Sequence, residues 1–401
     1  MNIAMFCVFS YVIFENADVT FSVISSVKIP MLLLGAMSLI LMGKVYIGKL
    51  FSKKYFPTFL FLGVLVTALL VNAILNRNPI LGVDPMRKTL RLILFLIDLF
   101  VLMVIAAEKR QTKKVLQFLY RYILLLIIAN DFLMFSRVAT FSVGRHETYL
   151  VGNKFSVSYL HMNFLMLWMI NNKKSITSYR YSPIRMMLGV AFYLAVALRV
   201  NCMTGVVGCL ILVTIFVLIE SPRCEKLLKF ASPGMLSIFI VGSMVFAFVA
   251  EIVLSIPIVS YVIKNVFGRD ISLTGRTNIY ALYTMTIPKH WLTGYGYGNA
   301  YDVTSTLFGF DNVQNALLQW VLQVGVIITA ILIVFLLYVF SGITKRETRN
   351  MPSILAIVAL IYTYVILGSV ETTFSMSFVM CFALIFMLRN ERPAGKISAV
   401  R

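Results

Sequence analysis

Residues 315–340 read NALLQWVLQVGVIITAILIVFLLYVF and carry no charged side chain. A helix of about 20 apolar residues is long enough to cross the hydrocarbon core of a bilayer. Similar apolar runs recur along the whole chain of 401 residues, which is 60% hydrophobic and 13% charged. Water-soluble domains are about 45–50% apolar and about 25% charged. The composition therefore predicts a protein that is solvated by lipid.

The apolar runs are roughly 15–22 residues long, which favours transmembrane helices over the shorter alternating strands of a barrel. We expect an all-α polytopic membrane protein with about 12 transmembrane helices, in one integral membrane domain over residues 1–401. The first and last runs are short, so ten or eleven spans would also fit. The expected spans are 1–14, 30–47, 57–75, 88–107, 115–135, 155–170, 184–199, 203–220, 231–252, 315–340, 352–370 and 374–389.

The distribution of the basic residues, which give the chain a net charge of +20, predicts an orientation in the membrane. Cytoplasmic loops of membrane proteins carry an excess of lysine and arginine, and most of the 36 basic residues fall in alternate connections. Both termini are then cytoplasmic, and the loops 136–156 and 255–315 are extracytoplasmic. No nucleic-acid motif is present, so we expect no nucleic-acid partner. The five cysteines are scattered, without the spacing of a metal site or a disulfide framework.

The loop 255–315 is the one long break between apolar runs, and its middle reads as a helix. Apolar residues of Thr277–Ile287 recur at helical spacing, with Thr274 as the expected N-cap and Pro288 as the expected end. Arg276 then lies in the first turn, where a cation opposes the helix dipole. An anion held by the free N–H groups and Arg276 would remove this mismatch. The alternative is an arginine that points into water.

A glycine–tyrosine run follows, in which Gly294, Gly296 and Gly298 alternate with Tyr295 and Tyr297. Glycine permits a close approach of the backbone to another group, and tyrosine rings could stack on sugar faces. The alternative is a tight turn at the membrane surface.

The loop ends in the polar segment Asp311–Asn315, from which Gln314 and Asn315 enter the next span together with Gln319. Amide groups that face lipid are costly, so we expect them to face the bundle interior or a wet cavity. Hydrogen bonding between helices is the simpler alternative.

The other basic residues on the expected outer side include several arginines. The planar guanidinium can donate two parallel hydrogen bonds to a phosphate. These residues are therefore candidates for binding an anionic group, although single arginines also cap helix ends. The candidates of this kind are Arg145, Lys154, Arg199 and Arg269.

Two of the ionisable residues inside expected spans are candidates for a role, Asp98 and His161. Asp98 lies in the middle of a span, and it either has a direct role or is paired or neutral. We interpret His161 as a hydrogen-bonded histidine of the bundle rather than as a catalyst.

The order of short motifs resembles a known family. GNKF (152–155) precedes a span, Thr204-Gly205 ends a short polar turn, and TGRT (274–277) lies in the long loop. GYGYG (294–298) and the pattern QNxxLxxxLxxxG (314–325) follow. This order resembles the superfamily of O-antigen and capsule polymerases (Wzy) and O-antigen ligases, by motif over residues 140–340 and by topology over the whole chain.

The resemblance implies an enzyme of the bacterial cytoplasmic membrane that acts on its outer face, without a metal, a cofactor or a nucleotide sugar. Its substrate would be an undecaprenyl-pyrophosphate-linked oligosaccharide, and its partners a flippase and a chain-length regulator of the same pathway. The polymerase moves the growing glycan onto an incoming lipid-linked repeat unit of O-antigen, capsule or exopolysaccharide. Arg276, Asp311, Gln314 and Asn315 would be catalytic. Arg269, Arg199, Arg145, Lys154, Tyr295 and Tyr297 would bind pyrophosphate or glycan.

Two positions depart from the family pattern. Gln314 stands where relatives often have histidine, and glutamine is no base near neutral pH. A base must then come from Asp311, Glu147, His146 or Asp302, or catalysis rests on leaving-group stabilisation alone. Met203 stands where relatives often have arginine, and Arg199 is its possible substitute.

Two other functions compete with the polymerase. A ligase would move finished polymer onto a different acceptor with the same chemistry. A flippase or solute transporter would place its binding charges near the midplane and would show symmetry between halves, whereas the polar candidates here cluster outside the membrane.

Overall fold

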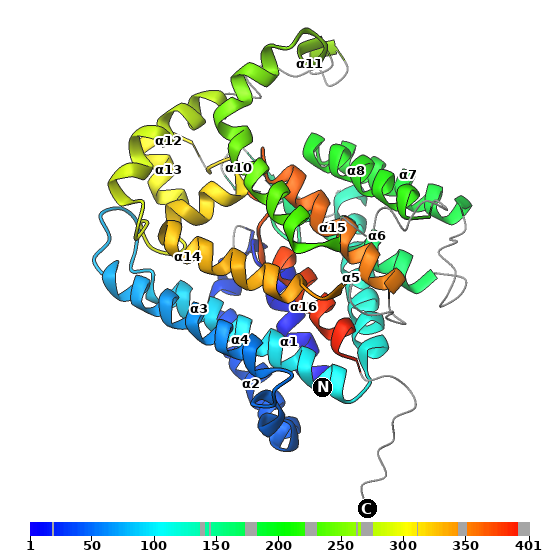
Figure 1. Ribbon diagram of the computed structural model, residues 1–401. Coiled ribbons are helices and arrows are strands. Elements are labelled where there is room, and N and C mark those ends of the chain that lie inside the picture. Colours follow the sequence, from blue (N-terminus) through cyan, green and yellow to red (C-terminus); the bar gives the residue numbers. More distant parts are fainter. Residues whose placement is uncertain are drawn as a thin grey trace, which may run out of the picture.

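Helices form at every one of the expected ranges in the computed structural model of the chain (Figure 1). The structure describes residues 1–17, 20–136, 141–143, 146–172, 183–220, 231–261, 264–265, 276–310, 312–343 and 351–391. The helices at the expected ranges are α1 (Asn2–Ile13), α2 (Ser22–Leu50), α3 (Phe56–Leu75), α4 (Met86–Glu108), α5 (Thr112–Ser136), α6 (Lys154–Asn172), α7 (Pro183–Arg199), α8 (Met203–Glu220), α10 (Pro233–Ser255), α14 (Ala316–Phe340), α15 (Met351–Leu367) and α16 (Met376–Asn390).

Six helices in the described part of the chain are long and apolar enough to cross a membrane, namely α2, α3, α4, α5, α10 and α14. Shorter apolar helices lie at α1, α7, α8, α15 and α16. These helices confirm the expectation of an all-α protein with several membrane-spanning helices. The crossing of the bilayer by all twelve helices stays a prediction.

Helix α4 lies at the centre of the bundle and helices α2 and α3 at its edge. Phe100 of α4 contacts Phe335 of α14 and Phe386 of α16, with ring centroids 5.1 Å and 5.7 Å apart. On α2 and α3, by contrast, large apolar side chains such as Leu41 and Leu75 are mostly exposed. Such a surface is costly in water and neutral in lipid, so α2 and α3 present the face expected of lipid-contacting helices.

The connections between the helices gather at two ends of the bundle. Hydrogen bonds link several connections at one end, which we call the loop end. Its described parts are 14–17, 76–85, 146–153, 200–202, 291–299, 312–315 and 368–375. The opposite end, which we call the lysine end, comprises 49–55, 108–112 and 389–391.

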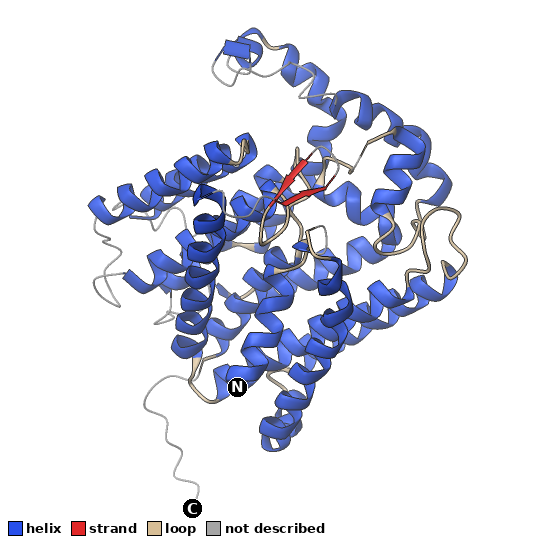
Figure 2. Cartoon of the chain, turned by 180° about the vertical axis from the view of Figure 1, so that it is seen from behind, coloured by secondary structure: helices blue, strands red, loops and turns tan. Residues whose placement is uncertain are grey.

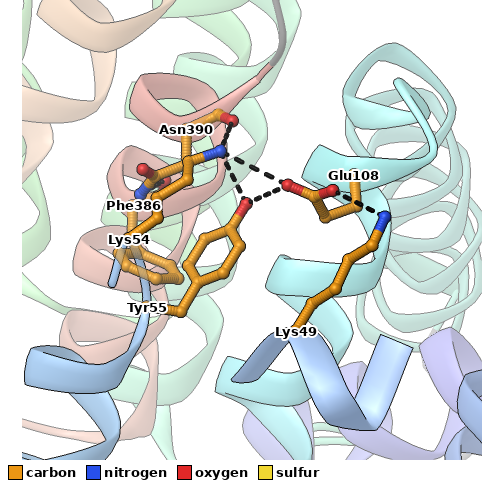
Figure 3. Close-up of polar contacts among 6 residues, drawn as sticks. All are labelled: Lys49, Lys54, Tyr55, Glu108, Phe386 and Asn390. Atoms are coloured by element: carbon orange, nitrogen blue, oxygen red, sulfur yellow. Dashed lines mark hydrogen bonds and ion pairs between the residues drawn. The ribbon is translucent and has the colours of Figure 1, made fainter. Parts of the chain in front are cut away.

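A buried carboxylate holds the lysine end together (Figure 3). The Glu108 side chain is only 2% exposed and lies 3.2 Å from Lys49 Nζ and 3.4 Å from Lys54 Nζ. The Tyr55 hydroxyl donates to the same carboxylate at 2.8 Å. Lys54 also donates to the Asn390 carbonyl at 2.8 Å. Exposed ion pairs contribute little to stability. This carboxylate is buried, however, and its three donors replace the water that it has lost. It therefore joins α4 to the ends of α2, α3 and α16.

The loop end contains short elements of its own. They are the strands β1 (Phe141–Val143) and β2 (His146–Thr148) and the helices α11 (Pro257–Tyr261), α12 (Arg276–His290) and α13 (Ala300–Phe308). β1 and β2 pair antiparallel, a hairpin that the sequence did not predict; Figure 2 shows it among the connections at this end. The expected helix over Thr277–Ile287 is confirmed as α12. It runs past Pro288 to His290, so the expected end at Pro288 is wrong by two residues. Thr274 lies outside the described residues.

We expect Glu108→Ala to destabilise the protein, because it leaves the buried Tyr55 hydroxyl and two ammonium groups without their shared acceptor. The expected loss is about 1–3 kcal/mol, measured as a lower apparent melting temperature of the purified protein in detergent. Lys53→Ala is the control, since Lys53 is exposed at the same end and its loss should change stability by less than about 0.5 kcal/mol. Equal melting temperatures for the two variants would contradict the role of Glu108.

Candidate functional site at the loop end

A break in helix α14 organises the loop end. Gly325 has a φ of 80° and a ψ of 170°, so the helical hydrogen-bond ladder stops there. The carbonyls of Leu322 and Gln323 instead accept hydrogen bonds from the N–H groups of Tyr295 at 2.9 Å and Gly296 at 2.8 Å. Unpaired backbone groups are costly inside a membrane. The glycine–tyrosine run therefore supplies the partners that the broken helix lacks.

One glycine on each side, Gly294 of the run and Gly325 of α14, is needed for this close approach. A Cβ atom on Gly294 would lie 2.5 Å from the Gln323 carbonyl, and one on Gly325 would lie 2.0 Å from the Leu292 carbonyl oxygen. Gly294 also has a φ of 62°, in the left-handed region that favours glycine. The backbone of the glycine–tyrosine run thus approaches another group closely, as expected. That group is the backbone of α14, which the sequence did not specify.

Lys88 of α4, Gln323 of α14 and the backbone of the α3–α4 connection also hold the run and Asn299, which follows it. Lys88 Nζ donates to the Gly298 carbonyl at 2.6 Å, and the Gln323 side chain accepts from the Gly298 N–H at 2.6 Å. The Asn299 side chain donates to the Val83 carbonyl at 2.9 Å and accepts from the Val83 N–H at 3.3 Å. The glycine–tyrosine run is therefore fixed between α14 and the α3–α4 connection. Figure 1 shows α12 and α13 above this end of α14.

The Asn315 side chain forms hydrogen bonds with backbone groups of three different segments. It is fully buried and is the N-cap of α14, where its Oδ1 accepts from the Leu318 N–H at 3.1 Å. Its Nδ2 donates to the carbonyls of Ser243 at 2.9 Å and Ser369 at 3.3 Å. These bonds join α10, α14 and the end of α15. They therefore agree with the simpler of the two expected roles, hydrogen bonding between helices. A direct catalytic role of Asn315 stays a prediction.

Gln314 is half-buried and connects α12 to the start of α14. Its φ of 55° is left-handed, and its carbonyl accepts from the Tyr280 hydroxyl at 2.8 Å. The same hydroxyl lies 3.1 Å from the Ser369 carbonyl. Tyr280 is one helical turn beyond Arg276, which begins α12 as expected. This contact brings α12 against the entry to α14.

Arg199 and Lys154 lie at the same end, at the end of α7 and the start of α6. Arg199 Nη1 lies 3.8 Å from Glu147 Oε2, which also accepts from the Tyr149 hydroxyl at 3.2 Å. Burial, with the adjacent Glu147 carboxylate, raises the pKa of Tyr149 to about 12. Lys154 Nζ lies 5.4 Å from the centre of the Phe155 ring. Arg199 thus has one carboxylate partner, and a cation at the C-terminus of α7 also complements the helix dipole.

The two predicted glycan-binding tyrosines have different surroundings. Tyr295 is 7% exposed and packs on His290, with ring centroids 4.4 Å apart. Tyr297 is half-buried and packs on Trp320 at 5.7 Å. Burial raises the pKa of Tyr297 well above its ordinary range, with added contributions from Tyr11 and the Glu15 carboxylate. Tyr297 therefore packs on α14, and sugar stacking by either ring stays a prediction.

Arg145, Arg269 and Asp311 lie outside the described residues, as does the side chain of Arg276. The predicted residues that the structure places at the loop end are Arg199, Lys154, Tyr295, Tyr297, Gln314 and Asn315, each with its own separate partners.

The interpretation of His161 as a hydrogen-bonded bundle residue is confirmed. Its Nδ1 lies 2.9 Å from the Val157 carbonyl and its Nε2 lies 3.0 Å from Asp131 Oδ2. Asp98 is buried in α4, and its Oδ2 has no hydrogen-bond partner among the described residues.

A polar cleft between α1, α6 and α16 was missed by the sequence reasoning. Glu15 and Asn16 form one wall, directly after the first apolar run. The residues that line it are Val12, Ile13, Glu15, Asn16, Ile123, Ser156, Tyr159, Leu160, Asn163, Ser375, Ser377 and Met380. In the sequence, the only local indication of this cleft was the pair Glu15 and Asn16, a charged and an amide residue at the end of a span.

Comparison with known proteins adds no relative, because no family model, no curated protein and no solved structure matches the chain. The family resemblance thus depends on the order and spacing of the short motifs.

We expect Gly325→Ala to release the glycine–tyrosine run from α14, because the new Cβ would collide with the Leu292 carbonyl and φ would be strained. Strain of this kind costs about 1–3 kcal/mol. Chymotrypsin should then cleave after Tyr295 and Tyr297 faster than in the unmodified protein. Gly242→Ala in α10 is the control, since a Cβ there meets open space. Cleavage at the same rate in all three proteins would refute this role of Gly325.

Proposed function

We propose that this chain is a membrane glycosyltransferase that polymerises undecaprenyl-pyrophosphate-linked oligosaccharide repeat units. One observation carries the proposal beyond motif order. Segments that are far apart in the sequence, the start of α6, the end of α7, the start of α12 and the Gln314–Asn315 entry, all belong to the loop end. A site for a large lipid-linked substrate needs such a gathering of polar segments beside an apolar bundle.

The proposed reaction breaks the bond between the anomeric carbon of the growing glycan and its pyrophosphate. A hydroxyl of the incoming repeat unit attacks that carbon, and the electron pair leaves with the lipid pyrophosphate. Negative charge develops on the leaving group, so fixed cations stabilise the transition state. Arg276, together with the free N–H groups at the start of α12, has this role. Arg199, Lys154, Arg145 and Arg269 bind the substrate around it.

The proton of the attacking hydroxyl needs an acceptor other than Gln314. Asp311 precedes the entry to α14 by a few residues and is the proposed acceptor. Asn315 then acts by holding the entry in place through its bonds to Ser243 and Ser369. The reaction needs no metal and no nucleotide sugar, because the lipid pyrophosphate is itself the activated leaving group.

The proposed location is the bacterial cytoplasmic membrane, with both termini in the cytoplasm and the loop end outside. The lysine end supports this orientation, because lysine and arginine concentrate on the cytoplasmic side of membrane proteins. A flippase that delivers the repeat unit and a regulator of chain length are the proposed partners.

We expect Arg276→Ala to abolish polymer while single repeat units still reach the cell surface, because one leaving-group contact is lost. Removal of one such donor typically lowers the rate by about 10²–10³-fold. The measurement is the length distribution of surface glycan on a gel. Lys289→Ala is the control on the same helix, since Lys289 is exposed near its end. A normal ladder in Arg276→Ala cells would exclude the proposed role.

We expect a cysteine at Ser305 on α13 to react with a membrane-impermeant maleimide in intact cells. The described native cysteines are buried, and Cys224 is replaced by serine in the tested protein. Lys53→Cys at the lysine end is the matched control and should react only after the membrane is permeabilised. The reverse pattern of labelling would overturn the proposed orientation.

A further inference from the structure

An apolar groove runs along one exposed face of α3 and begins at the turn that joins α3 to α2. Its volume is about 640 Å³, within the range of about 300–1,000 Å³ that is usual for ligand pockets. We call it the α3 groove. Its lining includes Phe51 of the turn and a stripe of α3 residues at helical spacing, namely Phe56, Leu60, Gly63, Val64 and Thr67.

A glycine leaves space in the middle of the groove. A Cβ atom on Gly63 would meet nothing within 4 Å. Glycine in the interior of a helix is destabilising relative to alanine, and here no close neighbour requires it. The large apolar side chains beside it are turned outward, since Leu60 is 55% and Val64 49% exposed. The packing of the protein itself therefore does not use this space, and it is open to an apolar group from the membrane.

The groove has the depth of one leaflet of a bilayer. From Phe56 to Thr67 the helix rises by about 16 Å. The hydrocarbon core of a bilayer is about 30 Å thick, so one leaflet contributes about 15 Å. Phe56 is the first residue of α3, so the groove extends from the lysine end to about the middle of the membrane. An occupant with this reach is the acyl chain of a single lipid.

The turn between α2 and α3 places basic side chains at the surface end of the groove. The Ser52 N–H donates to the Lys49 carbonyl at 2.9 Å, and the Phe56 N–H donates to the Ser52 carbonyl at 2.8 Å. These bonds close the turn tightly. Lys49 and Lys53 therefore lie beside Phe51 and Phe56, which line the groove.

The charges of this turn do not cancel. Lys49 and Lys54 share one carboxylate, that of Glu108, which lies between them (Figure 3). The Lys49 side chain is still 38% exposed, and Lys53 is exposed as well. One negative charge thus faces three positive charges. The turn carries an excess of positive charge directly beside an apolar groove, and its complement is an anionic head group with an apolar tail.

We propose that the α3 groove binds an anionic phospholipid of the leaflet at the lysine end. One acyl chain lies along Phe56–Thr67, and the phosphate lies near Lys49 and Lys53. Basic groups next to a transmembrane helix attract anionic lipids, and an apolar groove that opens to the bilayer is filled by hydrocarbon rather than by water. This site is independent of the polymerase proposal, because its residues lie away from the loop end.

The preference for charge is tested by native mass spectrometry of the delipidated full-length protein in detergent. The probes are phosphatidylglycerol and phosphatidylcholine with the same acyl chains. We expect phosphatidylglycerol to bind roughly fivefold more tightly or better, which is what one basic residue near an anionic lipid contributes. Lys53→Glu should remove this preference and leave the binding of phosphatidylcholine unchanged. Lys113→Glu is the control, since Lys113 is exposed at the start of α5 and does not line the groove.

The apolar part of the site is tested by Gly63→Phe, which fills the middle of the groove. It should weaken the binding of both lipids, by about fourfold for each methylene group that loses its contact. Gly242→Phe in α10 is the matched control, because a Cβ atom there also meets open space. Melting temperatures without added lipid show whether each variant is folded.

Three results would overturn the proposal. Equal binding of the two lipids to the unmodified protein would mean that α3 contacts bulk lipid only. A folded Gly63→Phe variant that binds both lipids as well as Gly242→Phe does would exclude the groove as the place of the acyl chain. A dimer that Gly63→Phe dissociates, with lipid binding unchanged, would assign the groove to a second copy of the chain.

Discussion

The backbone hydrogen bonds between the glycine–tyrosine run and the broken helix α14 are the constraint on which the loop end depends. Inside a membrane protein, a helix can break only where other groups pair with the freed carbonyls. Here Tyr295 and Gly296 donate to Leu322 and Gln323. Because the run is held there, its neighbours α12 and α13 lie over α14 (Figure 1). The Asn299 side chain, directly after the run, reaches the Val83 backbone between α3 and α4. The same bonds therefore stabilise a helix and position a loop.

Different interactions hold the connections together at the two ends of the bundle. At the lysine end, one buried carboxylate, Glu108, collects two ammonium groups and a hydroxyl. At the loop end, amide side chains such as those of Asn299 and Asn315 bind backbone carbonyls. Single charged groups join them, since Lys88 donates to the Gly298 carbonyl and Arg199 pairs with Glu147. The cohesion of the loop end is therefore spread over many separate hydrogen bonds.

The sequence by itself determined where the helices are, because a run of about 20 apolar residues in lipid has no alternative to a helix. The helical spacing of Thr277–Ile287 predicted α12 for the same local reason. Only the tertiary structure decided that Gly294 faces Gly325 of α14, that the Asn315 Nδ2 group donates to two backbone carbonyls, and that Glu15, Asn163 and Ser375 line one cleft. These contacts join residues far apart in the chain, and no periodicity or spacing encodes which distant backbone carbonyl or N–H group a side chain will meet.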